Sequence, residues 1–205
     1  MAKRKNKIRD LKSSTLILCE GESEKQYIIR LKSREREALR YLKIDPQPYI
    51  PQGDAISILN KAIEEAEYRK NVYCLIDLDQ VHTQQKFDKY IIFKNKALMK
   101  SNILVIESYP CFETWVKFHY ELITKEVCVC DSMKDEVLKH IVNYEKGDKG
   151  FDLYSHLKPL LPIAVTNAKS AENNRNKILE LNTKEKDCRL PFSDIYQLIE
   201  ALKIV

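Results

Sequence analysis

The stretch VYCLIDLD at residues 72–79 decides the fold. It starts with a short, apolar and partly β-branched run, which predicts a buried strand, and that run stops abruptly at Asp77 and Asp79. Upstream, the run STLILC at residues 14–19 has the same character and is followed directly by Glu20. Two predicted strands, about fifty residues apart, therefore end on acidic side chains.

A third apolar run, ILVI at residues 103–106, also ends on an acid, Glu107. Between and after these runs the apolar residues recur at helical spacing, which predicts alternating strands and helices. Such alternation is typical of parallel βαβ units, so we expect an α/β fold with an open, mainly parallel, Rossmann-like sheet flanked by helices. The helices are expected at residues 22–43, 54–66, 83–100 and 111–124.

The second half of the chain has a different pattern. Helices are expected at residues 131–142, 154–181 and 194–202, and loops at residues 43–53, 143–150 and 182–193. We therefore divide the chain into a basic N-terminal arm (1–13), an α/β core (14–125) and a mostly helical C-terminal part packed on that core (126–205).

The charge of the chain is concentrated at its start. The net charge is +5, and residues 1–12 alone carry that charge, so the remainder is neutral overall. Such an arm could neutralise phosphates of a nucleic acid, although a solvated, frayed terminus explains it equally well.

The six cysteines are expected to be reduced thiols of a cytoplasmic protein, because no secretory segment precedes them. No apolar run approaches the roughly 20 residues that span a bilayer, so no membrane association is expected. Cys128 and Cys130 could join His119 or His140 in a zinc site, but they lack the paired spacing of structural zinc motifs.

The acidic strand ends predict a metal site. In open α/β sheets ligands bind beyond the carboxyl ends of the strands, so Glu20 would meet Asp77 and Asp79 if their strands are neighbours. Glu24 would share a face with Glu20 in a first helical turn, although Glu22 and Glu24 could each simply complement the helix dipole. Hard carboxylate oxygens favour Mg²⁺ or Mn²⁺, which can support phosphodiester cleavage.

The same residues carry a family resemblance. The strand followed by EGESE (residues 20–24), with the later D-x-D, resembles the Toprim domain of topoisomerases, primases and related nucleases. With SYPCFETW (residues 108–115), Tyr144-x-Lys146 and the closing PFSDIYQLIEAL (residues 191–202), the chain from residue 15 onward resembles the RloB family, which includes the AbiLii abortive-infection protein.

This resemblance implies a Toprim-like core, a Mg²⁺-dependent nuclease acting on RNA or DNA in anti-phage defence, and an ATPase partner encoded nearby. It implies Glu20, Asp77 and Asp79 as catalytic residues, and Glu20, Glu24, Asp77 and Asp79 as metal ligands. The side chains that could support these ligands or contact substrate are Glu22, Ser108, Glu113, His119 and Lys146.

The residue patterns give separate expectations for three of these side chains. His119 lies on the apolar face of its helix, which favours a hydrogen-bonded core histidine. Glu113, in a first helical turn, could equally complement the helix dipole. Lys146 lies in a glycine-containing loop, where it could reach a phosphate or remain solvated.

Three other functions are compatible with parts of the sequence. DLDQV at residues 77–81 fits the nucleophile motif of haloacid dehalogenase phosphatases, and a D-x-D is also used by glycosyltransferases. Neither of these explains Glu20-Gly21-Glu22. A non-catalytic Toprim-like subunit that binds nucleic acid or nucleotide and regulates an ATPase remains the main alternative. The substrate, the number of metal ions and the oligomeric state are left open.

Overall fold

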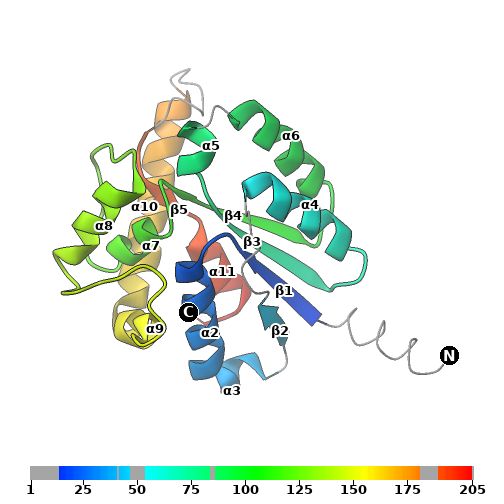
Figure 1. The fold of residues 1–205 in the computed structure, drawn as a ribbon, viewed down its shortest axis with the longest axis horizontal. Coiled ribbons are helices and arrows are strands. Elements are labelled where there is room, and N and C mark those ends of the chain that lie inside the picture. Colours follow the sequence, from blue (N-terminus) through cyan, green and yellow to red (C-terminus); the bar gives the residue numbers. More distant parts are fainter. Residues whose placement is uncertain (1–13, 41, 47–53, 84–85, 181–188, 205) are drawn as a thin grey trace.

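A computed structural model describes residues 14–40, 42–46, 54–83, 86–180 and 189–204 (Figure 1). The expected basic arm at residues 1–13 lies outside the described residues. The described part forms a central sheet with helices on both faces (Figure 1).

The described residues contribute five strands to the sheet, in the order β2-β1-β3-β4-β5. Strands β2, β1, β3 and β4 all run parallel to one another, and β5 is antiparallel to β4. This confirms the predicted open, mainly parallel sheet, while the Toprim-like assignment stays a prediction. The strands are β1 (Ser14–Cys19), β2 (Lys43–Pro46), β3 (Asn71–Asp77), β4 (Ile103–Tyr109) and β5 (Phe192–Ser193).

The two faces of the sheet bury different helices. Along β1, Leu16 and Leu18 face a cluster that includes α4 and α6, whereas Ile17 and Cys19 face a larger cluster containing α2 and the C-terminal helices. Because both faces are covered, the central strands are almost continuously apolar, as predicted for parallel sheets.

The helices follow the predicted order but several are shorter than expected. Asp54 caps α4 as predicted, with its carboxylate accepting a hydrogen bond from the Ser57 N–H at 2.8 Å. The helical elements are α2 (Glu22–Arg34), α3 (Arg36–Leu39), α4 (Ala55–Glu65), α5 (Asp79–Thr83), α6 (Phe87–Leu98), α7 (Glu113–Phe118), α8 (Cys130–Leu138), α9 (Leu153–Leu157), η1 (Lys158–Leu160), α10 (Leu161–Glu180) and α11 (Ile195–Ala201).

Two expectations at the sheet edges were wrong. The helix expected at residues 22–43 ends earlier, and its last residue begins β2, which pairs with β1. The loop expected at residues 182–193 contains β5, which pairs with the end of β4. Both strands are short, and pairing with a neighbouring strand determines their conformation more than their own sequence does.

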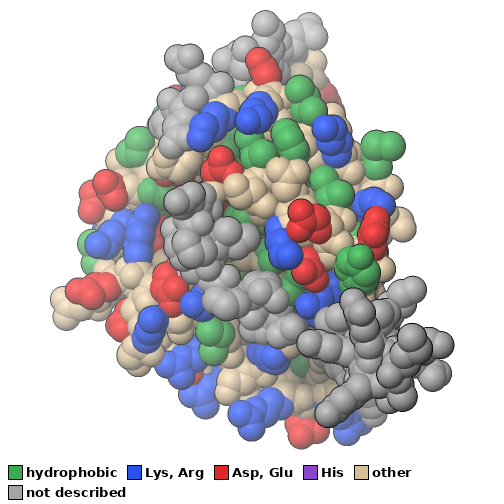
Figure 2. Space-filling model, turned by 45° about the vertical axis from the view of Figure 1, so that its right-hand side comes forward, with side chains coloured by type: hydrophobic (Ala, Val, Ile, Leu, Met, Phe, Trp, Pro, Cys, Tyr) green, Lys and Arg blue, Asp and Glu red, His purple; other side chains and the backbone are tan. Residues whose placement is uncertain are grey.

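The face of the molecule drawn in Figure 2 has no large patch of a single charge among its described residues. On the face in Figure 2, basic and acidic side chains are interspersed among hydrophobic ones. Among the described residues, no helix combines the length and apolar character needed to cross a bilayer.

Candidate metal site at the carboxyl edge of the sheet

The ends of β1 and β3 meet at the carboxyl edge of the sheet. These strands are parallel neighbours, with Cys19 opposite Leu75, so Glu20 and Asp77 both lie at this edge. The Asp77 N–H donates a hydrogen bond to Glu20 Oε2 at 3.1 Å. Asp79 follows at the first residue of α5, where its carboxylate accepts from the Gln80 N–H. The neighbouring strands required by the sequence argument are therefore present.

Glu24 is buried beside this edge, with only 3 % of its surface exposed. It lies in the first turn of α2, and its carboxylate accepts a hydrogen bond from the Gly21 N–H at 3.3 Å. A Cβ at residue 21 would be 2.8 Å from Glu24 Oε2, so glycine permits the carboxylate to fold back. Glu24 thus acts as a helix-capping acid and is also buried among other acids.

Glu113 joins these acids from the start of α7. It is 2 % exposed, and its carboxylate accepts hydrogen bonds from the Tyr144 hydroxyl at 3.0 Å and the Ser23 hydroxyl at 3.4 Å. The Lys146 Nζ lies 3.4 Å from Glu113 Oε2. We call Glu20, Glu24, Asp77, Asp79 and Glu113 the acidic cluster.

The loop at residues 144–147 is held against α2. The Gly147 N–H donates to the Ser23 hydroxyl at 3.0 Å, and Gly147 has a φ of +68°, a conformation that favours glycine. A Cβ there would lie 2.9 Å from the Cβ of Glu22. This close approach positions Tyr144 and Lys146 over Glu113.

Mutual repulsion and burial dominate the electrostatics of the cluster. Burial raises the pKa of Asp77 well above its ordinary value, and the charges of Glu24, Glu113, Glu20 and Asp79 raise it further. Burial also raises the pKa of Glu20 to about 8 and that of Glu24 to about 7. Lys146 opposes this effect by lowering the pKa of Glu24 and Asp79.

This donor set fits a hard divalent cation. The cluster contains buried carboxylate oxygens, which Mg²⁺ and Mn²⁺ prefer, and a cation would offset their repulsion. The residues that could hold it are Glu20, Glu24, Asp77 and Asp79. However, among the described residues, no three of these carboxylates have donor atoms within 4.8 Å of one another. They are close enough to repel one another but do not form a closed ligand set.

The other predicted site residues lie in three different surroundings. Glu22 pairs on α2 with Lys25 at 3.3 Å and Gln26 at 2.6 Å. Ser108 pairs in register with Asp77, but its hydroxyl is 2.8 Å from that of Ser193. These contacts place Glu22 on the surface of α2 and Ser108 in a hydrogen bond to β5.

His119 is a fully buried residue at the end of α7. Its Nδ1 lies 2.9 Å from the Trp115 carbonyl oxygen, and burial lowers its pKa to about 4. It packs in the core against the Trp115 ring, but only its Nδ1 has a hydrogen-bond partner, because its Nε2 is buried without one among the described residues.

Sequence reasoning missed a polar cluster next to Asp79. His82 lies one helical turn after Asp79 on α5, and its Nδ1 is 3.0 Å from Arg189 Nη1. Since arginine only donates hydrogen bonds, this Nδ1 accepts and the proton of the neutral ring is on Nε2. Arg189 Nη1 is also 3.3 Å from the Tyr109 hydroxyl. The only signal in the sequence was the three-residue spacing from Asp79.

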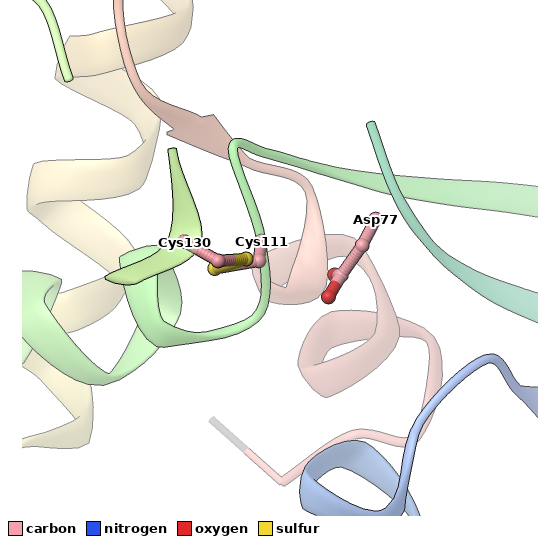
Figure 3. Close-up of side chains that lie close together, drawn as sticks. All are labelled: Asp77, Cys111 and Cys130. Atoms are coloured by element: carbon pink, nitrogen blue, oxygen red, sulfur yellow. A yellow bond between two sulfur atoms is a disulfide. The ribbon is translucent and has the colours of Figure 1, made fainter. Parts of the chain in front are cut away.

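The expectation that all cysteines are reduced was wrong for one pair. Cys111 and Cys130 form a disulfide that joins the segment before α7 to the start of α8 (Figure 3). Among the described residues, Cys19, Cys74 and Cys128 are free. The two residues are 19 positions apart, and their proximity depends on how α7 packs against α8. Cysteine spacing alone could not reveal this pairing.

Comparison with known proteins gives one family. The family described as RloB-like protein matches residues 15–202, a range that contains the whole acidic cluster and the 144–147 loop. Neither the curated proteins nor the solved structures gave a match. Membership of this family suggests a defence-related role. Since the match covers most of the sequence, the chain belongs to the RloB-like protein family.

Proposed function

We propose that this chain is a metal-dependent nuclease that hydrolyses phosphodiester bonds of RNA or DNA as an effector of anti-phage defence. The observation that carries the proposal is the hydrogen bond between Asp77 N–H and Glu20, which joins two acidic strand ends at the edge where α/β sheets bind ligands. The suggested defence role of the family supports the biological context.

The metal would be Mg²⁺ or Mn²⁺, held by Glu20, Asp77 and Asp79 with Glu24. When bound, such an ion lowers the pKa of a coordinated water and stabilises negative charge on a phosphate. Asp79 would contribute its carboxylate from the first residue of the short helix α5, two residues beyond Asp77 at the end of β3.

The protein side chains around the metal would orient the substrate. A carboxylate that is not saturated by the ion can accept a proton from the attacking water. Lys146 is 35 % exposed and adjoins the buried Glu113, so it can neutralise a phosphate that approaches the cluster. Tyr144 and Ser23 hold Glu113, which in turn holds Lys146.

We propose an ATPase as the protein partner, because the family resemblance implies one. The alternative is that the chain only binds nucleic acid or nucleotide and regulates that ATPase. One observation favours this alternative, because the cluster carboxylates do not form a compact group of three within the described residues.

The test compares cleavage by wild-type protein with that by a variant carrying Asp77→Asn and Asp79→Asn. Both substitutions keep shape while removing charge. Purified protein is incubated with Mg²⁺ or Mn²⁺ and a mixed panel of RNA and DNA. We expect the double variant to lose cleavage at least about 100-fold. Glu107→Gln is the matched control, because Glu107 is buried on the opposite face of the sheet, and this variant should cleave like wild type.

Two results would overturn the nuclease proposal. The first is undiminished cleavage by the double variant, which would show that another group or a contaminant performs the reaction. The second is nucleic-acid binding without cleavage by wild-type protein, with the ATPase partner present. That result would support the regulatory alternative.

A further inference from the structure

The disulfide lies directly beside the acidic cluster. A carboxylate oxygen of Asp77 and the sulfurs of Cys111 and Cys130 all lie within 4.8 Å of one another (Figure 3). Among the described residues, this is the one group of three potential metal ligands that is so compact. Its members come from the end of β3, the segment before α7 and the start of α8.

This group has a different chemistry from the carboxylates around it. Thiolates are soft ligands that favour zinc, whereas Mg²⁺ prefers oxygen alone. Two thiolates and one carboxylate make a three-ligand set that leaves a fourth position of a tetrahedral ion open. We propose that reduction of the Cys111–Cys130 disulfide creates a zinc-binding site formed by these two cysteines and Asp77.

The spacing of the residues suits such a site. In a tetrahedral zinc site the bonds to sulfur are about 2.3 Å and those to oxygen about 2.0–2.2 Å, so the ligand atoms lie roughly 3–4 Å apart. The Cα atoms of Cys111 and Cys130 are 5.7 Å apart, which leaves their side chains in reach of a shared ion. Cys111 is buried, while Asp77 and Cys130 are partly exposed, so an ion can enter from their side.

The reduction step needs a partner thiol. A dithiol reductant attacks one sulfur of the disulfide and forms a mixed disulfide, and its second thiol then releases the protein as two free thiols. The protein pair gains two electrons and two protons, and the reductant becomes a disulfide. Zinc binding then displaces the two thiol protons to solvent. The oxidised pair offers no thiolate, so this site exists only in the reduced protein.

Zinc at this site should also affect cleavage, an expectation that rests on the proposed nuclease function. Zinc held by the two thiolates would occupy Asp77 and withdraw it from the acidic cluster. Micromolar zinc should therefore inhibit the reduced nuclease and leave the oxidised nuclease less affected. A zinc-selective chelator, added with Mg²⁺ kept in excess, should restore the activity.

The direct test needs no nucleic acid. Cobalt(II) replaces zinc as the probe, because thiolate coordination gives it a near-ultraviolet charge-transfer absorption and tetrahedral geometry gives it visible bands. Full-length protein is reduced with a dithiol, separated from the reductant and titrated with cobalt. Displacement by zinc then measures zinc affinity. We expect one thiolate-bound cobalt per reduced chain and none in the oxidised chain.

Three variants complete the test. Cys130→Ser should lose the charge-transfer band and weaken zinc binding at least about 100-fold, and Asp77→Asn should keep the band with about tenfold weaker binding. Cys128→Ser is the matched control, because Cys128 is free, exposed and two residues away, and it should behave like wild type. Circular dichroism of each variant verifies that the chain is folded.

Two outcomes would overturn the zinc proposal. One is the absence of a thiolate charge-transfer band in reduced wild-type protein. The other is a loss of that band in Cys128→Ser as large as the loss in Cys130→Ser. Neither outcome concerns cleavage, so failure of this site and failure of the nuclease proposal can be told apart. A missing nuclease activity would leave the cobalt spectrum unchanged.

Discussion

Glu107 and Asp77 are acids near the ends of neighbouring strands, but their surroundings are opposite. Glu107 accepts a hydrogen bond from the Tyr90 hydroxyl at 2.5 Å and pairs with the Lys94 ammonium at 2.7 Å. Asp77 has Glu20, Glu24, Asp79 and Glu113 around it instead. The negative charge of Glu107 is therefore offset by Tyr90 and Lys94. Asp77 is instead surrounded by other acids.

The difference comes from the side of the sheet on which each residue lies. Alternate residues of a strand face opposite sides, and Glu107 faces α6, which supplies Tyr90 and Lys94. Asp77 faces the side on which α2 and α7 begin, and first helical turns favour acidic residues. An acidic strand end is therefore a metal-site candidate where its face supplies several further acids, and not where a hydroxyl and a lysine already bind its carboxylate as they do at Glu107.

The largest effect that should distinguish the two regions is pH dependence. In metal-free protein the pKa of Glu20 is raised to about 8 and that of Glu24 to about 7, so between about pH 4.5 and 8 the folded chain holds protons that the unfolded chain releases. Stability must fall as pH rises through this window. We expect a loss of about 3 kcal/mol, or roughly 6–12 °C in Tm, between pH 5.5 and 8.5 with chelator present.

Magnesium distinguishes the loss of stability caused by the acidic cluster from losses caused by other titrating groups. The pKa of Asp194, which burial and Glu107 raise to about 7, adds a fall of the same sign that magnesium should not reverse. Thermal unfolding at pH 8.5 with and without Mg²⁺ therefore isolates the acidic cluster, and binding of the ion should raise Tm. A Tm that is independent of both pH and Mg²⁺ would contradict this account of the cluster.

The same contrast explains what the sequence could and could not predict. The strands at residues 14–19, 72–76 and 103–106 were recognisable because buried parallel strands are continuous apolar runs, and they set the sheet and its carboxyl edge. The meeting of Glu20 with Asp77 followed from that edge. The acid at residue 107 gave the same signal, and only the structure shows that it faces Lys94.

The features that escaped prediction depend on contacts between segments distant in the sequence. The hydrogen bonds from Ser23 and Tyr144 to Glu113 join α2, the 144–147 loop and α7. The pairing of Cys111 with Cys130 depends on the packing of α7 against α8. No local periodicity encodes such contacts, because they depend on which surfaces the completed sheet brings together.

Neutralising one acid in each region should change stability in opposite directions. Glu107→Gln leaves Lys94 without its charged partner and should destabilise the fold by about 2 kcal/mol, less than for a fully buried pair because Lys94 is partly exposed. Asp77→Asn removes the cost of burying an acid among like charges and should stabilise metal-free protein by about 1 kcal/mol at pH 8. Urea unfolding in the presence of a chelator measures both changes in the free energy of unfolding. Changes of the same sign would refute the contrast between the two regions.

The smallest effect tests the loop that holds a lysine over the acidic cluster. Gly147→Ala introduces a Cβ 2.9 Å from the Glu22 Cβ at a positive φ, so the loop must shift and release Lys146 from Glu113. We expect the free energy of unfolding to fall by about 1 kcal/mol. Gly150→Ala is the matched control, because its Cβ would meet only the Asp148 side chain at 3.3 Å. If both substitutions lower the free energy of unfolding in urea by the same amount, the close approach of this loop to α2 does not stabilise the site.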